Sequence, residues 1–456
     1  MRPGFKSRIW QQHTLQRFKE LEYNALIQAP TAAGKTVFAI MAISLLRIKH
    51  PGLRTTIVVP TINLLHQWKQ ELKFFLDISD DKIGIFYGAK KDDSKNKEFM
   101  IYVINSASRD NNLKNQQMIN SFELVIFDEV HHSGANTHKK LFDIANFQYK
   151  LGISATPDRE HDDEGTILMS NFFKNRINVP KEFVEMAPMI TNMIRLEFTE
   201  EEKQQYEELK IRLATLQTKL EKQHGLSPNS KTFFPRLNKM AGEGILEAKL
   251  FIGVIRGMEN LRFKAENKLK IINNLASSDL DQKTIIFCDR IDFVNQIYSM
   301  LRRNYPEREV FKIHSKLTKS EQTGQLESFK YGDKGILVAA KIVDEGFDVP
   351  DAEIGILVSF TKTKRQTIQR DGRILRFVKG KIAKKYVLVI NDIDEHTYLD
   401  LLVKTNQIDS ALKGAWYEFK DNEFSTAPDF KANFRISYLN KLFNKGEGNS
   451  LNIRNS

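Results

Sequence analysis

The sequence predicts an α/β protein with two tandem parallel-sheet lobes, a helical linker or insertion between them and a small C-terminal extension. Short apolar runs alternate with helix-length segments in the N-terminal part of the chain, and the same alternation returns later. Between these two parts the hydrophobic period changes to three and four residues. The 456 residues suffice for about three domain-sized units. Hydrophobic residues at 41% and charged residues at 28% are typical of globular proteins.

The first predicted lobe covers residues 1–180. Its strands are expected at the apolar runs Ala25–Gln28, Thr56–Val59, Met100–Ile104, Leu124–Phe127 and Lys150–Ser154. The segments between these runs are long enough for crossover helices, which favours a parallel sheet.

The second predicted lobe covers residues 266–398 and repeats this plan. Its strands are expected at Thr284–Phe287, Val310–Ile313, Gly335–Ala339, Ile354–Val358 and Tyr386–Ile390. Apart from this duplicated plan, the sequence shows no internal repeat.

The linker, residues 181–265, is expected to be helical. Thr199 with Glu202 three positions later fits a capping box at a helix start. Apolar residues then follow at three- and four-residue spacing, and this seam comprises Tyr206, Leu209, Leu213, Leu216 and Leu220. A seam of about two heptads favours a helix packed on a lobe over a coiled coil. The turn signals of 225–229 end this helix, and Glu247–Leu275 is a second helical stretch leading into the second lobe.

The C-terminal extension covers residues 399–456 and carries no recognisable chemistry. Its end, from Lys431, is rich in Lys and Arg. Contact with phosphates is one interpretation of this basic end, and a solvated tail is the favoured one.

The charge balance is basic, with 69 Lys and Arg against 57 Asp and Glu and a net charge of +12. This favours a polyanionic partner, although a lysine-rich proteome explains it equally well. The single cysteine, Cys288, excludes an internal disulfide. The N-terminus lacks the apolar core of a signal peptide, and the longest apolar run, Val37–Leu46, is too short to span a bilayer. We therefore expect a cytoplasmic protein without a membrane partner.

A phosphate-binding loop is predicted at Ala29–Thr36, which follows a strand and opens a helix. Backbone N–H groups and the positive helix end attract phosphate oxygens. Lys35 supplies a cation and Thr36 a hydroxyl for Mg²⁺. The nucleotide-binding residues predicted in this loop are Thr31, Ala33, Gly34, Lys35 and Thr36.

A pair of carboxylates ends the apolar strand Leu124–Phe127. Asp128 is placed to hold Mg²⁺ together with Thr36, and Glu129 to polarise the attacking water. The sequence therefore predicts ATP and Mg²⁺ as cofactors, with Lys35, Asp128 and Glu129 as catalytic residues.

The order of short motifs along residues 1–398 resembles that of the superfamily 2 helicases. The matching segments are Arg8–Gln11, Pro60–Trp68, Asp128–His131, Ser154–Pro157, Ile285–Arg290, Asp344–Pro350 and Gln369–Arg376. Each segment is short, but together and in family order they are highly specific. The resemblance implies two RecA-like lobes that close on one ATP.

The resemblance also implies roles for individual residues at the nucleotide. Gln11 would read adenine, and further nucleotide contacts would come from Gly346, Asp348 and Gln369. Arg373 and Arg376 would be catalytic arginine fingers, since residues three apart share one face of a helix.

Further implied roles concern the nucleic acid. The contacts would come from Thr61, Asn105, Ser108, Arg290 and Lys341. Hydrolysis would be coupled to strand movement by His131, Ser154 and Thr156.

Within the superfamily, the Asp-Glu-Val-His box and the segments around Ser154 and Lys341 are similar to the XPB-like, UvsW-like and type III restriction motors. That branch implies a helicase or translocase on duplex or branched DNA, in DNA repair or phage defence. The sequence departs from the family at Ala32, where Gly is usual, and at Asn105–Ser108, where Thr-x-Gln-Ser is common. Two alternatives remain. One is an RNA helicase, and the other is the motor subunit of a defence or restriction complex with a nuclease partner in trans.

Overall fold

The computed structural model contains two compact units. Unit 1 comprises Met1–Pro188, Ile342–Asp351 and Arg365–Ile382, and unit 2 comprises Met189–Lys341, Ala352–Lys364 and Ala383–Ser456. The structure describes residues 4–31, 33–88, 90–108, 122–133, 141–142, 147–158, 162–185, 187–228, 230, 232–278, 280–340, 352–359, 364–374, 382–405 and 407–438.

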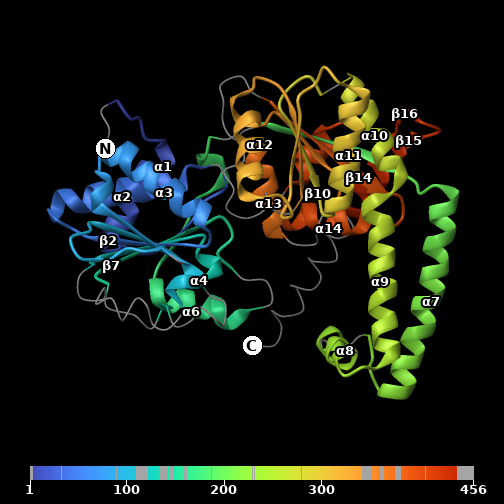
Figure 1. Cartoon of the computed structure of the whole chain (residues 1–456), viewed down its shortest axis with the longest axis horizontal. Coiled ribbons are helices and arrows are strands. Elements are labelled where there is room, and N and C mark those ends of the chain that lie inside the picture. Colours follow the sequence, from blue (N-terminus) through green and yellow to red (C-terminus); the bar gives the residue numbers. More distant parts are fainter. Residues whose placement is uncertain are drawn as a thin grey trace, which may run out of the picture. The chain divides into compact units, whose positions relative to one another are not determined.

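Unit 1 is built on a central β-sheet (Figure 1). The sheet has eight strands in the order β4-β3-β5-β2-β6-β7-β1-β8. All neighbouring strands are parallel except β3 and β4. The strands are β1 Asn24–Gln28, β2 Thr55–Val59, β3 Ile83–Tyr87, β4 Lys90–Lys91, β5 Phe99–Val103, β6 Leu124–Asp128, β7 Tyr149–Ser154 and β8 Arg176–Asn178. The five strands predicted for this lobe are confirmed, with ends that differ by at most one residue.

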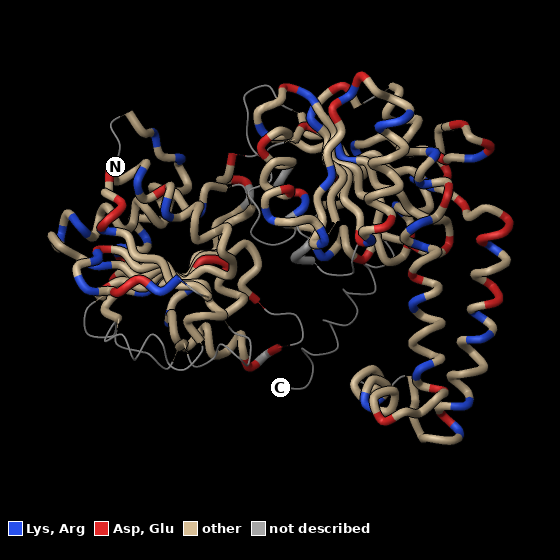
Figure 2. Tube along the Cα trace, in the orientation of Figure 1, with Lys and Arg blue, Asp and Glu red and all other residues tan. Residues whose placement is uncertain are grey.

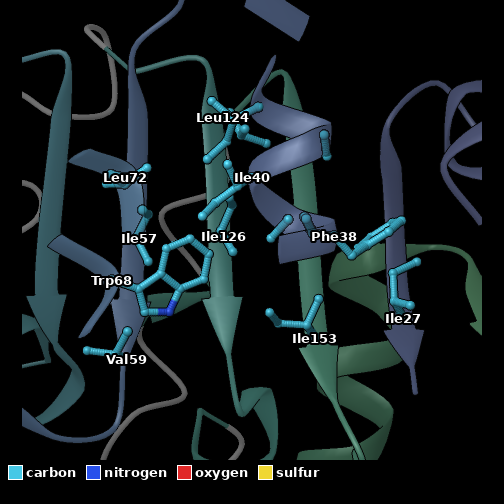
Figure 3. Close-up of a cluster of buried hydrophobic side chains, with 14 of the residues drawn as sticks. Ile27, Phe38, Ile40, Ile57, Val59, Trp68, Leu72, Leu124, Ile126 and Ile153 are labelled. Carbon is cyan, nitrogen blue, oxygen red and sulfur yellow. The ribbon is translucent and has the colours of Figure 1, made fainter. Parts of the chain in front are cut away.

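Helices cover both faces of this sheet. They are α1 Ile9–Glu20, α2 Lys35–Lys49, α3 Ile62–Leu76, α4 Ile104–Ala107 and α6 Asp163–Phe173, with short 3-10 turns η1 Asp80–Lys82, η4 Val130–His132 and η6 Lys181–Phe183. One core contains Phe38 of α2 and Trp68 of α3 (Figure 3), and a second contains Phe172 and Phe173 of α6. Because both faces are buried, the central strands consist mostly of apolar residues.

Unit 2 contains a second eight-stranded sheet with the order β11-β12-β10-β13-β14-β9-β15-β16. Among the described strands of this sheet, β15 and β16 form an antiparallel pair and the other neighbours are parallel. The strands are β9 Met189–Leu196, β10 Thr284–Cys288, β11 Val310–Ile313, β12 Ile336–Ala340, β13 Ile354–Leu357, β14 Ala383–Ile390, β15 Trp416–Lys420 and β16 Glu423–Thr426. The five strands predicted for the second lobe are therefore present.

The sheet of unit 2 begins earlier in the chain than the sequence analysis expected. β9 pairs with β14 along its full length and with β15 on its other side. Its buried residues include Thr191 and Asn192. These polar residues interrupt the apolar run that would have identified a buried strand in the sequence.

The helices of unit 2 include a long hairpin. The elements are α7 Glu200–His224, α8 Phe233–Gly242, α9 Leu246–Lys264, α10 Glu266–Ser278, α11 Ile291–Asn304, α12 Lys319–Tyr331, α14 Glu395–Thr405 and α15 Ile408–Lys413. α13, Lys364–Ile374, follows β13, and its residues from Arg365 onward are grouped with unit 1.

α7 and α9 lie side by side, and α8 lies at the end of their hairpin away from the sheet (Figure 1). The predicted capping box of Thr199 and Glu202 is present, and Gly225 ends α7 in the left-handed conformation. Leu209, Leu213, Leu216 and Leu220 of the α7 seam pack against α8 and α9 in a core that also includes Leu237 and Val254. The first seam residue, Tyr206, lies instead beside Phe198, with ring centroids 5.3 Å apart, and Phe198 packs on the core of the second sheet. The expectation that this helix packs on a lobe therefore holds at Tyr206 and is wrong for the rest of the seam, where α9 supplies the partner surface. Both basic and acidic residues occur along α7 and α9 (Figure 2).

The helical stretch predicted at Glu247–Leu275 is two helices, divided at Ala265 with φ −48° and ψ 130°. Before this break, α9 packs in the hairpin core. After it, Ile271, Ile272 and Leu275 of α10 pack in the core of the second sheet. The break redirects the chain from one core to the other.

The C-terminal extension is folded into unit 2 over its described residues. β15 pairs with β9, and residues 428–438 are helical. The ring of Trp416 lies 4.7 Å from that of Phe430 and 4.8 Å from that of Phe434, between centroids. Lys431 donates to the carbonyl of Gly414 at 3.2 Å. The solvated-tail interpretation was therefore wrong as far as residue 438, because buried aromatic side chains hold this segment.

Among the described residues, no helix combines the length and the apolar character needed to cross a bilayer. The single cysteine, Cys288, is buried at the end of β10.

Candidate ATPase site

Three of the predicted motifs meet at one edge of the sheet in unit 1. β6, β7 and β1 are adjacent and parallel, so their carboxyl ends lie side by side. The phosphate loop follows β1, Glu129 follows β6 and Ala155 follows β7. The carboxyl edge of an open parallel sheet is where such folds bind ligands.

The phosphate loop turns into α2 through Gly34, whose φ of 86° lies in the left-handed region. A side chain there would be strained by this φ and would lie 3.1 Å from Nε2 of Gln11, measured from Cβ. The carbonyl of Ala33 accepts from Nη1 of Arg8 at 3.0 Å and from Nε1 of Trp10 at 3.1 Å. The entry to α1 therefore holds the loop from one side.

Gln11 also contacts this loop through its side chain. Its Nε2 donates to the carbonyl of Gly34 at 3.0 Å, and its Oε1 accepts from the N–H of Arg8 at 2.9 Å. The structure thus brings Gln11 to the predicted nucleotide site, where both ends of its amide bind backbone groups.

Lys35, the first residue of α2, points toward Glu129, which follows β6. Its Nζ lies 4.0 Å from Oε1 of Glu129 and 3.4 Å from the carbonyl of Pro30. Glu129 has a φ of 46°, a left-handed conformation that is costly for a residue other than glycine. Such strain in a short turn between a strand and η4 is typical of functional sites.

Asp128 is a buried carboxylate at the end of β6. Its Oδ2 accepts from Nε1 of Trp68 at 2.8 Å, and its Oδ1 accepts from the N–H of Glu129 at 2.9 Å. Burial raises the pKa of Asp128 well above its ordinary value, and the charge of Glu129 raises it further. The Trp68 N–H and the Lys35 ammonium act in the opposite direction.

His131, Ser154 and Thr156 form one hydrogen-bonded group beside Glu129. Nδ1 of His131 lies 3.0 Å from Oγ of Ser154, which also accepts from the N–H of Thr156 at 3.1 Å. The Ser154 hydroxyl is 3.3 Å from Oε2 of Glu129, and Nδ1 of His131 is 3.5 Å from the same oxygen. The three residues predicted to couple hydrolysis to movement are therefore joined to the carboxylate predicted to orient water.

The donors at this edge fit a hard divalent cation. Asp128 offers carboxylate oxygens, and Thr36 at the start of α2 offers a hydroxyl. Mg²⁺ prefers oxygen ligands and is usually bound by one or two carboxylates together with substrate phosphates. A nearby cation would also offset the mutual repulsion of Asp128 and Glu129.

Residues predicted to contact nucleic acid lie at two further strand ends of the same sheet. Thr61 follows β2 and caps α3, where its hydroxyl accepts from the N–H of Leu64 at 3.3 Å. Asn105 and Ser108 follow β5 in and after α4, and Asn105 is exposed. They share the carboxyl edge with the phosphate loop because all these strands are parallel.

Arg290 follows β10 in unit 2 and is the N-cap residue of α11. Its Nη2 lies 3.4 Å from Oε2 of Glu259, and its guanidinium lies 5.0 Å from the ring centroid of Phe263. Both partners belong to α9, so the predicted nucleic-acid residue rests on the base of the hairpin.

Within unit 1, α13 contacts the phosphate loop. The hydroxyl of Thr31 donates to the carbonyl of Ile368 at 3.0 Å, and a Cβ at Gly372 would collide with Thr31. The side chains of Gln369 and Arg373, in the same helix, are not among those that the structure describes. The predicted residues Lys341, Gly346, Asp348 and Arg376 lie outside the described part of the chain altogether.

Three further side chains at this site were not predicted to take part in it: Arg8, Trp10 and Trp68. All three lie in motifs of the sequence in which functional roles were assigned to other residues, Gln11 and Thr61. Only the fold shows that their N–H groups reach Ala33 and Asp128.

Adjacent strand ends carry a phosphate loop, a buried aspartate followed by glutamate, and a coupling group. This combination defines a P-loop nucleoside triphosphatase. The family described as "Type III restriction enzyme, res subunit" matches residues 5–159, and the "Helicase conserved C-terminal domain" matches residues 267–378. The chain belongs to the superfamily 2 helicases, in the branch that includes XPB and the type III restriction motors, and is an ATP-hydrolysing helicase.

Individual relatives are similar over most of this chain. It is 29% identical over 360 residues to "DNA 3'-5' translocase XPB2" of Sulfurisphaera tokodaii, covering 78% of this chain and 75% of the relative. It is 25% identical over 485 residues to "Putative ATP-dependent RNA helicase MJ1505" of Methanocaldococcus jannaschii, covering 90% of this chain and 61% of that protein. The fold is similar to that of the Pyrococcus furiosus Hef helicase domain, with a TM-score of 0.61, 18% identity and coverage of 86% and 97%.

Proposed function

We propose that this protein is an ATP-driven translocase or helicase that acts on duplex or branched DNA. The observation that carries the proposal is the meeting of Lys35, Asp128, Glu129 and Ser154 at the carboxyl edge of one parallel sheet. The similarity to a relative named a DNA 3'-5' translocase supports DNA as the substrate. The net charge of +12 favours a polyanion.

In this proposal ATP lies on the phosphate loop. The backbone of Thr31, Ala33 and Gly34 and the start of α2 cradle the phosphates, and Lys35 neutralises the β- and γ-phosphates. Thr36 and Asp128 hold Mg²⁺, which when bound supplies positive charge at the phosphate oxygens.

Other residues complete the nucleotide site. Gln11 reads adenine from its place beside Gly34. Further nucleotide contacts are assigned to Gly346, Asp348 and Gln369 on the strength of their motifs.

Glu129 is proposed to orient the attacking water and to accept its proton. Its carboxylate lies between Lys35 and the group of His131 and Ser154, so a change in either neighbour alters its position. Arg373, together with Arg376, is proposed to stabilise the charge that develops on the transferred phosphoryl group. The contact of α13 with the phosphate loop supports the assignment of Arg373.

Nucleic acid is proposed to bind along the edge that carries Thr61, Asn105 and Ser108, and at Arg290 and Lys341. His131, Ser154 and Thr156 transmit the state of the nucleotide to this surface. The two motor lobes are assigned to residues 1–180 and 266–398, and β9 adds a strand to the second lobe.

Two other functions have specific support. The similarity to a relative named an RNA helicase favours action on RNA. The match to a restriction-subunit family favours a motor that serves a nuclease partner in a defence complex. We place the proposed function in DNA repair or phage defence, in the cytoplasm.

The proposal is tested by steady-state ATP hydrolysis with duplex DNA, branched DNA, single-stranded RNA and no nucleic acid in parallel. Duplex or branched DNA should stimulate turnover well above the level reached with RNA. Stimulation by RNA alone would support the RNA helicase. Equal turnover in all four reactions would contradict a nucleic-acid motor of either kind.

A further inference from the structure

The indole of Trp68 is hydrogen-bonded to the carboxylate proposed to hold the metal ion. Nε1 of Trp68 donates to Oδ2 of Asp128 at 2.8 Å. Trp68 lies in the second turn of α3 and Asp128 at the end of β6, so the bond joins a helix to the strand beneath it. An N–H group that donates to a carboxylate makes a stronger bond than one between neutral partners.

This bond determines how the Asp128 carboxylate is oriented. Oδ1 accepts from the N–H of Glu129, so each oxygen receives one donor from a different direction. A carboxylate has about four lone-pair sites on its two oxygens, so two donors fix its plane and leave acceptor capacity for a cation. Without the indole N–H, Oδ2 loses this restraint, and the carboxyl is free to rotate about χ2.

The indole itself is held firmly by the core. Trp68 is fully buried and belongs to the same cluster as Ile57, Val59 and Ile126. Figure 3 shows the ring between β2 and β6, with its nitrogen on the side toward which these strands point. A ring packed in this way presents its N–H at a fixed place, as a positioning group requires.

We propose that Trp68 is a positioning residue, which holds Asp128 in the orientation that binds the metal ion of the metal–ATP complex. This inference rests on the proposed role of Asp128 as a metal ligand. Groups that hydrogen-bond to metal ligands contribute to affinity because they restrict the ligand to its binding orientation. Trp68 itself does not touch the substrate in this account.

The decisive variant replaces Trp68 by β-(3-benzothienyl)alanine, which keeps the fused ring and exchanges the N–H for sulfur. Trp68→Phe is the genetically simpler version. Binding of Mn²⁺ is measured by electron paramagnetic resonance on the full chain with a non-hydrolysable ATP analogue. Loss of the indole N–H should weaken Mn²⁺ binding by about ten- to a hundredfold. In the benzothienyl variant, which fills the same space, binding of the analogue in EDTA and the midpoint of thermal unfolding should stay close to those of the wild-type protein. Trp68→Phe leaves a cavity in the core, so its unfolding midpoint should fall.

Two control variants distinguish a failure of the inference about Trp68 from a failure of the proposed metal role of Asp128. Trp416→Phe removes a buried indole N–H in unit 2, where it donates to the carbonyl of Ala411 at 2.8 Å, and should leave Mn²⁺ binding unchanged. Asp128→Asn should abolish tight Mn²⁺ binding. If Asp128→Asn binds Mn²⁺ normally, the proposed metal role of Asp128 is wrong. If Asp128→Asn loses Mn²⁺ binding but the benzothienyl variant keeps full Mn²⁺ affinity, Trp68 is a packing residue and the inference about it is overturned.

Discussion

The ammonium nitrogen of Lys35 lies 4.0 Å from Oε1 of Glu129, so the cation of the phosphate loop faces the carboxylate that follows β6. Both side chains are largely buried, with 11% and 20% of their surface exposed. An arriving triphosphate competes with Glu129 for Lys35, since both are anions. Occupation of the loop would therefore release Glu129 to act on water. This relationship makes Glu129 the first residue to test.

Glu129→Gln should bind ATP and hydrolyse it at least about a hundredfold more slowly, because an amide keeps the shape but cannot accept the proton of water. Nucleotide binding at equilibrium and single-turnover hydrolysis measure the two effects separately. Glu182→Gln, the same substitution at an exposed position of unit 1, serves as the matched control. Loss of ATP binding together with hydrolysis would identify Glu129 as structural.

Ser154→Ala should reduce the stimulation of ATP hydrolysis by DNA roughly fivefold or more, while basal hydrolysis persists. The hydroxyl links His131, Glu129 and the N–H of Thr156, so its removal leaves these groups without their common partner. Turnover at a series of DNA concentrations measures the effect. The control variant Ser170→Ala removes a serine hydroxyl that, in the described structure, bonds only the carbonyl of Thr166. Its DNA-stimulated ATP hydrolysis should equal that of the wild-type protein. Full stimulation in Ser154→Ala would rule out a coupling role.

Arg373→Ala should lower DNA-stimulated turnover on the order of a thousandfold while ATP affinity changes little. Arg373→Lys should recover little activity, because lysine keeps the charge but loses the two-pronged geometry of the guanidinium. Arg376→Ala is expected to behave similarly. Arg302→Ala, on the exposed side of α11, is the matched control. An Arg373→Ala protein with normal stimulated turnover would show that this residue is not an arginine finger.

Because Lys268 is buried, we expect the free energy of unfolding to depend on pH in a specific way. Its ammonium is buried and donates to the carbonyl of Arg262 at 2.6 Å. Burial lowers the pKa of Lys268 from 10.5 to about 8, and nearby Asp394 offsets part of this effect. Because the folded pKa lies below the unfolded one, the unfolded state binds more protons between these values. The free energy of unfolding therefore gains a contribution from Lys268 that grows as pH rises from about 8 to 10.5.

Lys268→Met removes this contribution. The difference in unfolding free energy between the unchanged protein and the variant should therefore rise by up to about 3 kcal/mol across that window. Urea unfolding at a series of pH values measures the difference. Lys270→Met, on the same helix and partly exposed, controls for the loss of one lysine. If the difference in unfolding free energy stays constant between about pH 8 and 10.5, Lys268 has the same pKa in the folded and unfolded states.

The regular part of the fold could be predicted from the sequence because buried parallel strands are short apolar runs. β6 and β10, for example, were expected within a residue of their observed ends. The capping box at Thr199 was predictable because its two side chains bond backbone groups only three residues away. Local signals of this kind require no knowledge of tertiary packing.

Features that depend on distant partners were not predicted. β9 carries buried polar residues and is a strand only because β14 and β15 lie beside it. α7 packs on α9, and nothing in its own apolar seam identified that partner. The bond between Trp68 and Asp128 spans 60 positions and depends on β2 and β6 being neighbours. Motifs thus named most of the candidate site, whereas the groups that hold it in place required the structure.

In the proposed function, ATP bound at Lys35 drives movement along DNA. Displacement of a triplex-forming oligonucleotide from duplex DNA measures such movement directly, because the third strand is released only when a motor passes through it. The unchanged protein should release the oligonucleotide with ATP but not with ADP or a non-hydrolysable analogue. Lys35→Ala, which lacks the cation for the phosphates, should still bind the DNA but release nothing. Release by Lys35→Ala, or ATP hydrolysis by the wild-type protein without any displacement, would show that ATP bound at Lys35 does not drive movement along DNA.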